Sequence, residues 1–139
     1  MLAKEVMSRN IKIVPSNTGL QAAAELMREM DVGTLPVSED GRIVGMLTDR
    51  DIVVRAVANG SDPRSTPARE VMTRDVISVY EDQDARDVAY LMEQKRVRRV
   101  VVVNRDNEAV GLISVDDLAL HPETRDLADE VVMQFSQHH

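Results

Sequence analysis

The sequence of 139 residues contains no cysteine and no tryptophan, and only 2% of its residues are aromatic. Without cysteine, the chain forms no disulfide, performs no thiol chemistry and holds no metal through thiolates. The few aromatic rings leave almost nothing on which nucleic-acid bases can stack, and a formal net charge of -7 repels a phosphate backbone. We therefore expect no nucleic-acid ligand, unless a local basic patch overrides the net charge.

Histidines and long apolar runs are also scarce. The three histidines are His121, His138 and His139, and the final pair has the form of a remnant of an expression tag. The chain has no Ser-His-Asp set, no glycine-rich phosphate loop and no paired metal-ligand spacing, so we expect neither an enzyme nor a metal site. No run approaches the ~20 apolar residues of a membrane span, and the amino end lacks a signal-peptide pattern. We expect a cytoplasmic protein that binds no membrane.

What the sequence does contain is an internal repeat. Residues 3–9, Ala-Lys-Glu-Val-Met-Ser-Arg, return at 68–74 as Ala-Arg-Glu-Val-Met-Thr-Arg. One inserted residue near Asn107 raises the offset from 65 to 66, so that residues 45–52 align with 111–118. Both of these stretches read Gly, two apolar residues, a hydroxyl residue, two variable residues, Asp and an apolar residue. Because neither copy can bury much apolar surface alone, we expect the copies to pack about a pseudo-twofold axis, with a ligand cleft between them.

Each half gives the same order of elements, β-α-β-β-α, which places the chain in the α+β class. In the first half we predict strands at 11–14, 34–37 and 42–47, and helices at 18–30 and 48–59. In the second half we predict strands at 76–79, 99–103 and 109–113, and helices at 85–95 and from Ser114 onward.

The proline-rich stretch after Gly60 is predicted to be a linker. We therefore divide the chain into a first repeat (1–60), a linker (61–67), a second repeat (68–120) and a carboxyl-terminal helix and tail (121–139). The helix is predicted at 123–136, with Leu127, Val131 and Phe135 on one face. It has no counterpart in the first half, and we expect it to cap the module or to contact a partner.

The repeated hydroxyl and acid, Thr48 with Asp51 and Ser114 with Asp117, have the spacing of a helix capping box. Capping alone explains both pairs. Glu is the usual acid in a capping box, however, whereas Asp occurs both times here, directly after a glycine-containing strand that lets another group approach the backbone. A ligand site therefore stays open beside the capping role.

The repeat, the order of elements and the two Gly-x-x-[Thr/Ser]-x-x-Asp stretches together resemble the cystathionine-β-synthase (CBS) domain pair, or Bateman module, over residues 1 to about 120. The dipeptides Met7-Ser8 and Met72-Thr73, the Leu35-Pro36-Val37 strand and residues 48–51 are most similar to small bacterial proteins made of little else than one CBS pair. The resemblance implies a homodimer that binds an adenosine-containing ligand between its repeats and requires no cofactor. The candidate ligands are AMP, ADP, ATP, S-adenosylmethionine and NADH.

The resemblance also implies roles for individual residues. In the family, the equivalent Asp accepts hydrogen bonds from ribose hydroxyls and the Thr or Ser lies beside the ribose or phosphate, which assigns these roles to Asp51 with Thr48 and to Asp117 with Ser114. An ionised carboxylate suits two vicinal hydroxyls because it only accepts hydrogen bonds.

In the family, basic residues at the start of the strand that corresponds to 99–103 here can contact phosphates, so Arg98 and Arg99 become candidates. Arg50 is added from the first turn of its helix. The alternative is a strand edge protected by charge. Because the first half has Gly33 and Thr34 where the second has these arginines, the second site is favoured for a phosphorylated ligand.

Ten residues occupy strand positions that line an adenine slot in the family. Most of them would belong to the core in any interpretation, because strands buried on both faces read as unbroken Val and Ile runs, so we expect about two or three to contact a ligand. They are Ile11, Ile13, Leu35, Pro36 and Met46 in the first half, and Val76, Ser78, Val100, Val101 and Leu112 in the second.

Two classes of function follow. The first is a regulatory sensor, in which an adenine nucleotide changes the repeat arrangement or the dimer and thereby signals to a separate effector protein. The alternative is a ligand-free scaffold that dimerises or docks on another protein through its Ala- and Met-rich helix faces. A sensor should leave its cleft open with Asp51 and Asp117 facing it, whereas a scaffold should fill the cleft and use these acids as helix caps.

Overall fold

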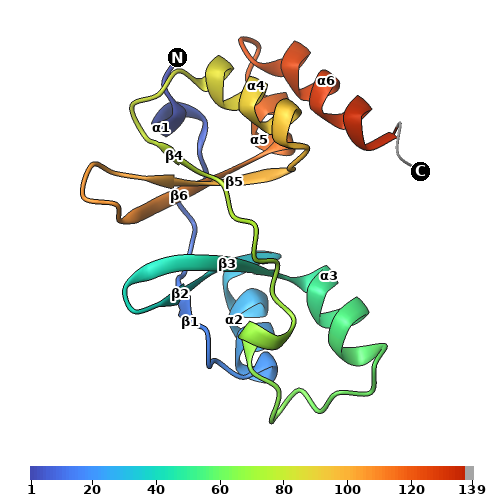
Figure 1. Cartoon of the computed structure of the whole chain (residues 1–139). Helices are drawn as coiled ribbons and strands as arrows, with labels where there is room; N and C mark the ends of the chain where they lie inside the picture. The colour runs from blue at the N-terminus through green and yellow to red at the C-terminus, as the bar shows by residue number, and fades with distance from the viewer. Residues whose placement is uncertain (137–139) are drawn as a thin grey trace. The chain divides into compact units, whose positions relative to one another are not determined.

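The computed structural model describes residues 1–136, and the chain divides into two compact units. The central unit consists of Asn10–Val76, and the split unit combines Met1–Arg9 with Ile77–His139. Each unit contains one three-stranded sheet (Figure 1). Within residues 1–136, every helix is too short or too polar to span a bilayer.

The central unit is a small sheet with helices packed on it. Strand β1 pairs in parallel with β2, and β2 pairs antiparallel with β3. Its elements are β1 (Val14–Pro15), α2 (Leu20–Met30), β2 (Thr34–Glu39), β3 (Arg42–Thr48), α3 (Asp49–Asp51), the π-helical turn η1 (Ile52–Val57) and the 3-10 turn η2 (Ala68–Glu70).

The split unit repeats this topology, with β4 parallel to β5 and β5 antiparallel to β6. Its elements are α1 (Ala3–Val6), β4 (Ser78–Tyr80), α4 (Ala85–Lys95), β5 (Arg99–Val103), β6 (Ala109–Ser114), α5 (Val115–Leu120) and α6 (Arg125–Ser136). The predicted α+β class and the order β-α-β-β-α in each repeat are therefore confirmed.

Local backbone conformations explain where the elements end. Helices α2 and α4 stop at equivalent residues, Asp31 and Arg96, which both adopt the left-handed conformation with φ of 55°. Asp40 and Gly41 also have positive φ, the conformation of the two-residue turn that closes a β-hairpin, here between β2 and β3. Gly60 has a φ of 73° after the predicted end of its helix.

We call the repeated stretches 3–9 and 68–74 the exchanged segments, because each packs in the unit that contains most of the other repeat. Segment 68–74 begins the second repeat but lies in the central unit, and segment 3–9 begins the first repeat but lies in the split unit. Thr73 exchanges two backbone hydrogen bonds with Met46 of β3, at 2.8 and 2.9 Å, and Ser8 exchanges two with Leu112 of β6. Each sheet is thus extended by the segment that the sequence places in the other repeat.

Several local features differ from the predictions, including the strand predicted at 76–79, which is Ser78–Tyr80. The short turns α1 and η2 were not predicted, because four and three residues do not reveal a helical period. The strand predicted at 11–14 is only Val14–Pro15, because β1 pairs solely with Val37 and Ser38. The helix predicted from residue 48 becomes π-helical after Asp51.

Helix α6 packs on α4 and α5 within the split unit (Figure 1). Leu127 and Val131 are buried as predicted, while the side chain of Phe135, and His138 and His139, lie outside the described residues. Thr124 ties the turn before α6 to α5 by donating its hydroxyl proton to the carbonyl of Leu118, at 2.7 Å. Helix α6 therefore completes the core of the split unit.

Candidate functional site

In the central unit, Thr48 and Asp51 form a reciprocal capping box at the start of α3. The Thr48 backbone N donates to Asp51 Oδ2 at 3.0 Å, and the Asp51 backbone N donates to Thr48 Oγ1 at 3.0 Å. The Thr73 hydroxyl donates to the same carboxylate at 3.3 Å from Oδ1 and 3.4 Å from Oδ2, and Arg55 Nε lies 3.8 Å from Oδ1. The Asp51 residue is only 7% exposed, so its two oxygens are occupied by protein groups.

In the split unit, Ser114 and Asp117 form the equivalent box with fewer partners. The Ser114 backbone N and hydroxyl lie 2.9 and 3.1 Å from Asp117 Oδ2, and the Asp117 backbone N donates to Ser114 Oγ at 3.2 Å. No hydrogen bond or ion pair within residues 1–136 involves Oδ1 of Asp117. The Asp117 residue is partly exposed. This carboxylate therefore keeps acceptor capacity for a ligand.

The structure brings the two predicted arginines next to this second box. Arg99 begins β5 and pairs directly with Ser114 across the sheet. The carbonyl of Arg98 accepts a hydrogen bond from the Val115 backbone N at 3.1 Å, at the start of α5. Both arginines are exposed. Four predicted site residues of the second repeat thus lie together within one compact unit.

The central unit has the same backbone arrangement, with Gly33 and Thr34 at the positions of Arg98 and Arg99. Asp49 N donates to the carbonyl of Gly33 at 3.0 Å, and Thr34 pairs with Thr48. A Cβ on Gly33 would lie 2.9 Å from Oδ2 of the exposed Asp49 side chain. Arg50 is exposed and lines a shallow hollow with Asp49, Val53 and Val54.

Of the residues predicted to line an adenine slot, Leu35 and Val100 are fully buried in the hydrophobic cores of their units. Pro36 and Met46 pair across β2 and β3, as Val101 and Leu112 pair across β5 and β6. Because side chains alternate along a strand, these two pairs lie on the sheet faces opposite Leu35 and Val100.

The remaining slot candidates are less enclosed. Ile13 is 37% exposed, Ser78 is exposed, and Ile11 and Val76 are partly buried outside the strands.

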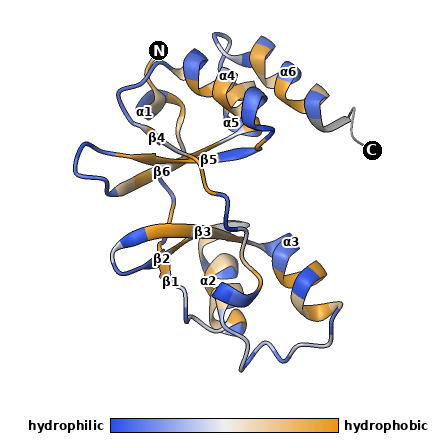
Figure 2. Ribbon diagram, viewed as in Figure 1, coloured by the Kyte–Doolittle hydropathy of each residue, from blue (hydrophilic) through white to orange (hydrophobic). Residues whose placement is uncertain are grey.

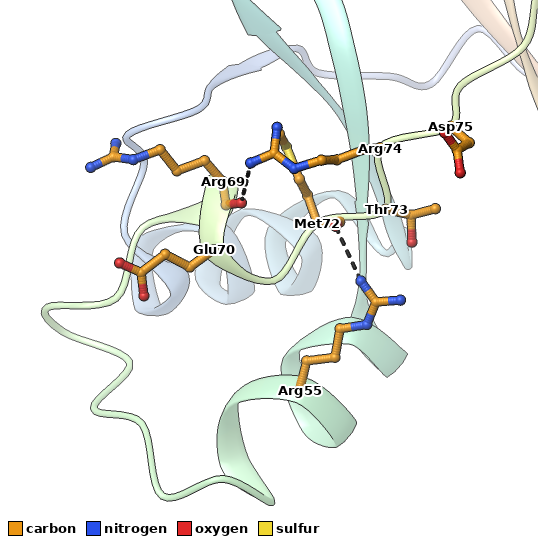
Figure 3. A pocket seen from close by; sticks show the side chains of 7 residues that line it. All are labelled: Arg55, Arg69, Glu70, Met72, Thr73, Arg74 and Asp75. Atoms are coloured by element: carbon orange, nitrogen blue, oxygen red, sulfur yellow. Dashed lines mark hydrogen bonds between the residues drawn. The ribbon is translucent and has the colours of Figure 1, made fainter.

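A hollow of about 810 Å³ in the central unit was not predicted as a site (Figure 3). Arg55 on η1 reaches it from one side, and the exchanged segment 68–74 with Asp75 forms the other side. The sequence did contain a signal for Arg55: it follows Asp51 by four residues in the helix predicted at 48–59, a spacing that allows an ion pair. The lining residues are Arg55, Arg69, Glu70, Met72, Thr73, Arg74 and Asp75.

Residues 1–136 contain no group of three or more His, Asp or Glu side chains placed to hold a metal ion. What the boxes can do chemically is accept hydrogen bonds from hydroxyl groups, and what the nearby arginines can do is donate to anionic oxygens.

Comparison with known proteins agrees with the geometry. A relative from Bacillus subtilis, "CBS domain-containing protein YhcV", is 36% identical over 133 residues, which cover 96% of this chain and 94% of the relative. The CBS domain protein PAE2072 from Pyrobaculum aerophilum, complexed with AMP, has a TM-score of 0.78 and 27% identity, and the match covers 93% of this chain and 99% of that one.

The CBS domain pair of protein MJ0100, in complex with 5-methylthioadenosine and S-adenosyl-L-methionine, has a TM-score of 0.73 and 28% identity, with coverage of 86% and 98%. The family model described as "CBS domain" matches this chain twice, at residues 3–57 and 68–122. The chain therefore belongs to the CBS domain family and carries two CBS domains in tandem.

Proposed function

We propose that the chain is a regulatory module that senses an adenine nucleotide through Ser114, Asp117, Arg98 and Arg99. The observation that carries the proposal is the Asp117 carboxylate, which has one oxygen without a partner among residues 1–136 and is partly exposed. Two ribose hydroxyls can donate to such a group, because a carboxylate accepts several hydrogen bonds. The ligands bound in the two structural relatives, AMP, 5-methylthioadenosine and S-adenosyl-L-methionine, all contain adenosine.

Charge favours a phosphorylated ligand such as AMP over S-adenosylmethionine. Arg98 and Arg99 enter β5 beside Ser114 and present guanidinium groups that match phosphate oxygens. ADP, ATP and NADH carry the same adenosine and phosphate groups, and S-adenosylmethionine tests the site without a phosphate.

The first-repeat box is expected to bind the same ligand more weakly or not at all. A ribose at Asp51 must displace the Thr73 hydroxyl, and it must also compete with the Arg55 contact. Replacing hydrogen bonds that already exist yields little net free energy. The engaged acid is also the observation that favours the alternative, a ligand-free scaffold, because there Asp51 acts as a helix cap.

Signalling is proposed to occur by a shift between arrangements of the module or of a homodimer, read by a separate effector protein. A ligand can shift such an equilibrium only by its difference in affinity for the two arrangements. Val53, Val54 and Val57 on η1 are 58%, 47% and 61% exposed and offer an apolar surface for the dimer (Figure 2). The absence of catalytic activity and a cytoplasmic location stay predictions from the sequence.

The test is isothermal titration calorimetry with AMP, ADP, ATP, NADH and S-adenosylmethionine. We expect saturable AMP binding that is lost in Asp117→Ala and retained in Asp51→Ala. Asp116→Ala is the matched control, because Asp116 carries the same charge in the same helical turn and is exposed. If none of the ligands binds to the well-folded wild-type chain, the sensor is excluded and the scaffold becomes the better account.

A further inference from the structure

Helix α6 gives the split unit an outer surface that has no counterpart in the central unit. The helix, Arg125–Ser136, lies beyond residues 3–57 and 68–122, which the CBS domain model matches. It lies beside α4 (Figure 1) and buries Leu127, Ala128 and Val131 in the core of the unit. A role for the outer surface of α4 and α6 therefore does not follow from the CBS fold itself.

An ion pair joins the first turns of these two helices. Arg86 Nη2 lies 3.5 Å from Asp126 Oδ2, and Arg86 Nη1 donates to the carbonyl of Glu123. Side-chain hydrogen bonds to Tyr90 and to Asp126 raise the pKa of Arg86. From this pair both helices run in the same general direction (Figure 1), so residues at similar distances along them line one seam.

Helical spacing gives the residues that line this seam. In a helix, residues four and seven positions after a given residue lie on the same face. The stripe that begins at the ion pair consists of Arg86, Tyr90 and Glu93 on α4, and of Asp126, Glu130 and Met133 on α6. We call these two stripes, together with Asp129, the α4–α6 seam.

The α4–α6 seam combines exposed apolar side chains with unpaired acids. Tyr90 is 46% exposed and Met133 is 56% exposed. Asp129 and Glu130 are exposed and Glu93 is partly exposed. In the part of the chain that the structure describes, none of these three acids forms an ion pair. Three negative charges thus surround two apolar side chains that lie open to solvent.

This combination limits the kind of partner that can bind. Exposed apolar side chains grouped among polar ones are typical of protein interaction sites, and methionine adapts its shape to a partner. The acids repel nucleic-acid phosphates and anionic lipid head groups, and they attract lysine and arginine. A helix with an apolar stripe between basic residues complements both properties of the seam.

We propose that the α4–α6 seam docks a basic amphipathic helix of a partner protein. Apolar side chains of that helix pack on Tyr90 and Met133, while its lysine or arginine side chains pair with Glu93, Asp129 and Glu130. The proposal goes beyond the proposed function and is independent of it, because it involves neither Asp117 nor the arginines of β5.

The probe is a synthetic peptide of lysine and leucine, about 18 residues long, with the leucines on one helical face. It is titrated into the full chain by calorimetry. A second peptide has the same composition, but its leucines follow no helical period. We expect saturable binding of the first peptide, weaker binding at higher salt because the charges lie at the surface, and much weaker binding of the second peptide.

Two pairs of variants localise the binding. Glu130→Lys should weaken it about tenfold, because it places like charges opposite each other. Its matched control is Glu29→Lys, which makes the same charge change at an exposed acid of α2 without a described ion pair. Met133→Ala should weaken binding about fivefold, whereas Leu120→Ala should not, although Leu120 on α5 is 74% exposed.

All four variants should keep the melting temperature of the wild type, because each changes an exposed side chain. Equal affinities for the two peptides, or equal affinities of Glu130→Lys and Glu29→Lys, would show general charge attraction and overturn the proposal. Loss of a wild-type dimer in Glu130→Lys would also overturn it, because a second copy of the chain would then cover the seam.

One further measurement separates this proposal from the sensor. Asp117→Ala should bind the amphipathic peptide as the wild type does while it loses AMP, and Glu130→Lys should bind AMP normally while its affinity for the peptide falls. Failure of either proposal is therefore visible without failure of the other.

Discussion

Gly45 and Gly111 are equivalent residues that lie under the methionines of the exchanged segments. A Cβ on Gly45 would lie 2.7 Å from Met72 Sδ and 2.8 Å from the Thr73 carbonyl oxygen, and a Cβ on Gly111 would meet Met7 and Ser8 at the same distances. The carbonyl oxygen cannot move away easily, because its residue is hydrogen bonded to β3 or β6. The repeated glycine thus admits protein backbone, whereas the sequence suggested only that some group approaches there.

We expect Gly45→Ala and Gly111→Ala each to destabilise the chain by about 1–3 kcal/mol through overpacking, measured by urea unfolding. Gly33→Ala is the control. Its Cβ would lie 2.9 Å from Asp49 Oδ2, but this atom ends an exposed, flexible side chain that can rotate away. A stability of Gly45→Ala equal to that of Gly33→Ala would contradict the packing role.

At the same scale, the two hydroxyl and acid pairs could be predicted from the sequence, both as capping boxes and by their repetition. The differences between them could not be predicted. Thr73 and Arg55 bind Asp51 because segment 68–74 crosses to the central unit, and no local pattern encodes that crossing. The hollow lined by arginines was missed for the same reason.

This difference between the boxes predicts a difference in stability. Asp51→Ala removes the acceptor of both the Thr48 backbone N and the Thr73 hydroxyl and leaves Arg55 without its carboxylate, which should cost about 1–3 kcal/mol. Asp117→Ala removes only the bonds within its own box, and its loss should be smaller. Chemical denaturation of both variants checks the order, and a larger loss for Asp117→Ala would refute it.

Among the elements, the long and periodic ones were predicted most closely. Helix α4 and strand β5 have the predicted bounds, Ala85–Lys95 and Arg99–Val103. Short elements depend on tertiary contacts: α1 and η2 are stabilised by burial of Ala3, Val6 and Ala68 rather than by helix propensity. Propensity and pattern are too weak over three or four residues to reveal such turns.

Helix α6 was predicted from its apolar face, and its contribution to stability can be tested residue by residue. Leu127 is 2% exposed in the core of the split unit, whereas Met133 on the same helix is 56% exposed. Leu127→Ala should destabilise the chain by about 2–5 kcal/mol, because it leaves a cavity, and Met133→Ala should stay within about 0.5 kcal/mol of the wild type. Thermal and urea unfolding measure both; equal effects would mean that α6 is not part of the folded core.

For the whole molecule, the repeats of the sequence and the compact units are different divisions of the chain. The family match separates 3–57 from 68–122, while the compact units exchange the segments that begin these ranges. A sequence repeat reports which residues are alike, and it contains no information on which copy a segment packs against. The pseudo-twofold packing expected between the repeats stays a prediction.

Self-association is a property of the whole molecule that both functional classes allow. If the exposed valines of η1 form the dimer interface, sedimentation should give twice the chain mass of 15.5 kDa for the wild type. The double variant Val53→Glu/Val57→Glu should sediment as a monomer, because it places charges in an apolar contact. Met133→Glu, an exposed apolar position on α6, is the control and should remain a dimer.

Addition of AMP then distinguishes a sensor from a scaffold. Ligand binding and dimerisation influence each other by the same factor when both depend on one equilibrium, so a sensor that signals through its dimer must change its dimer fraction when AMP is added. A scaffold keeps the same fraction with and without AMP. A wild-type chain that sediments as a monomer at every concentration would exclude the valine surface as a dimer interface, and signalling would then have to occur within a single chain.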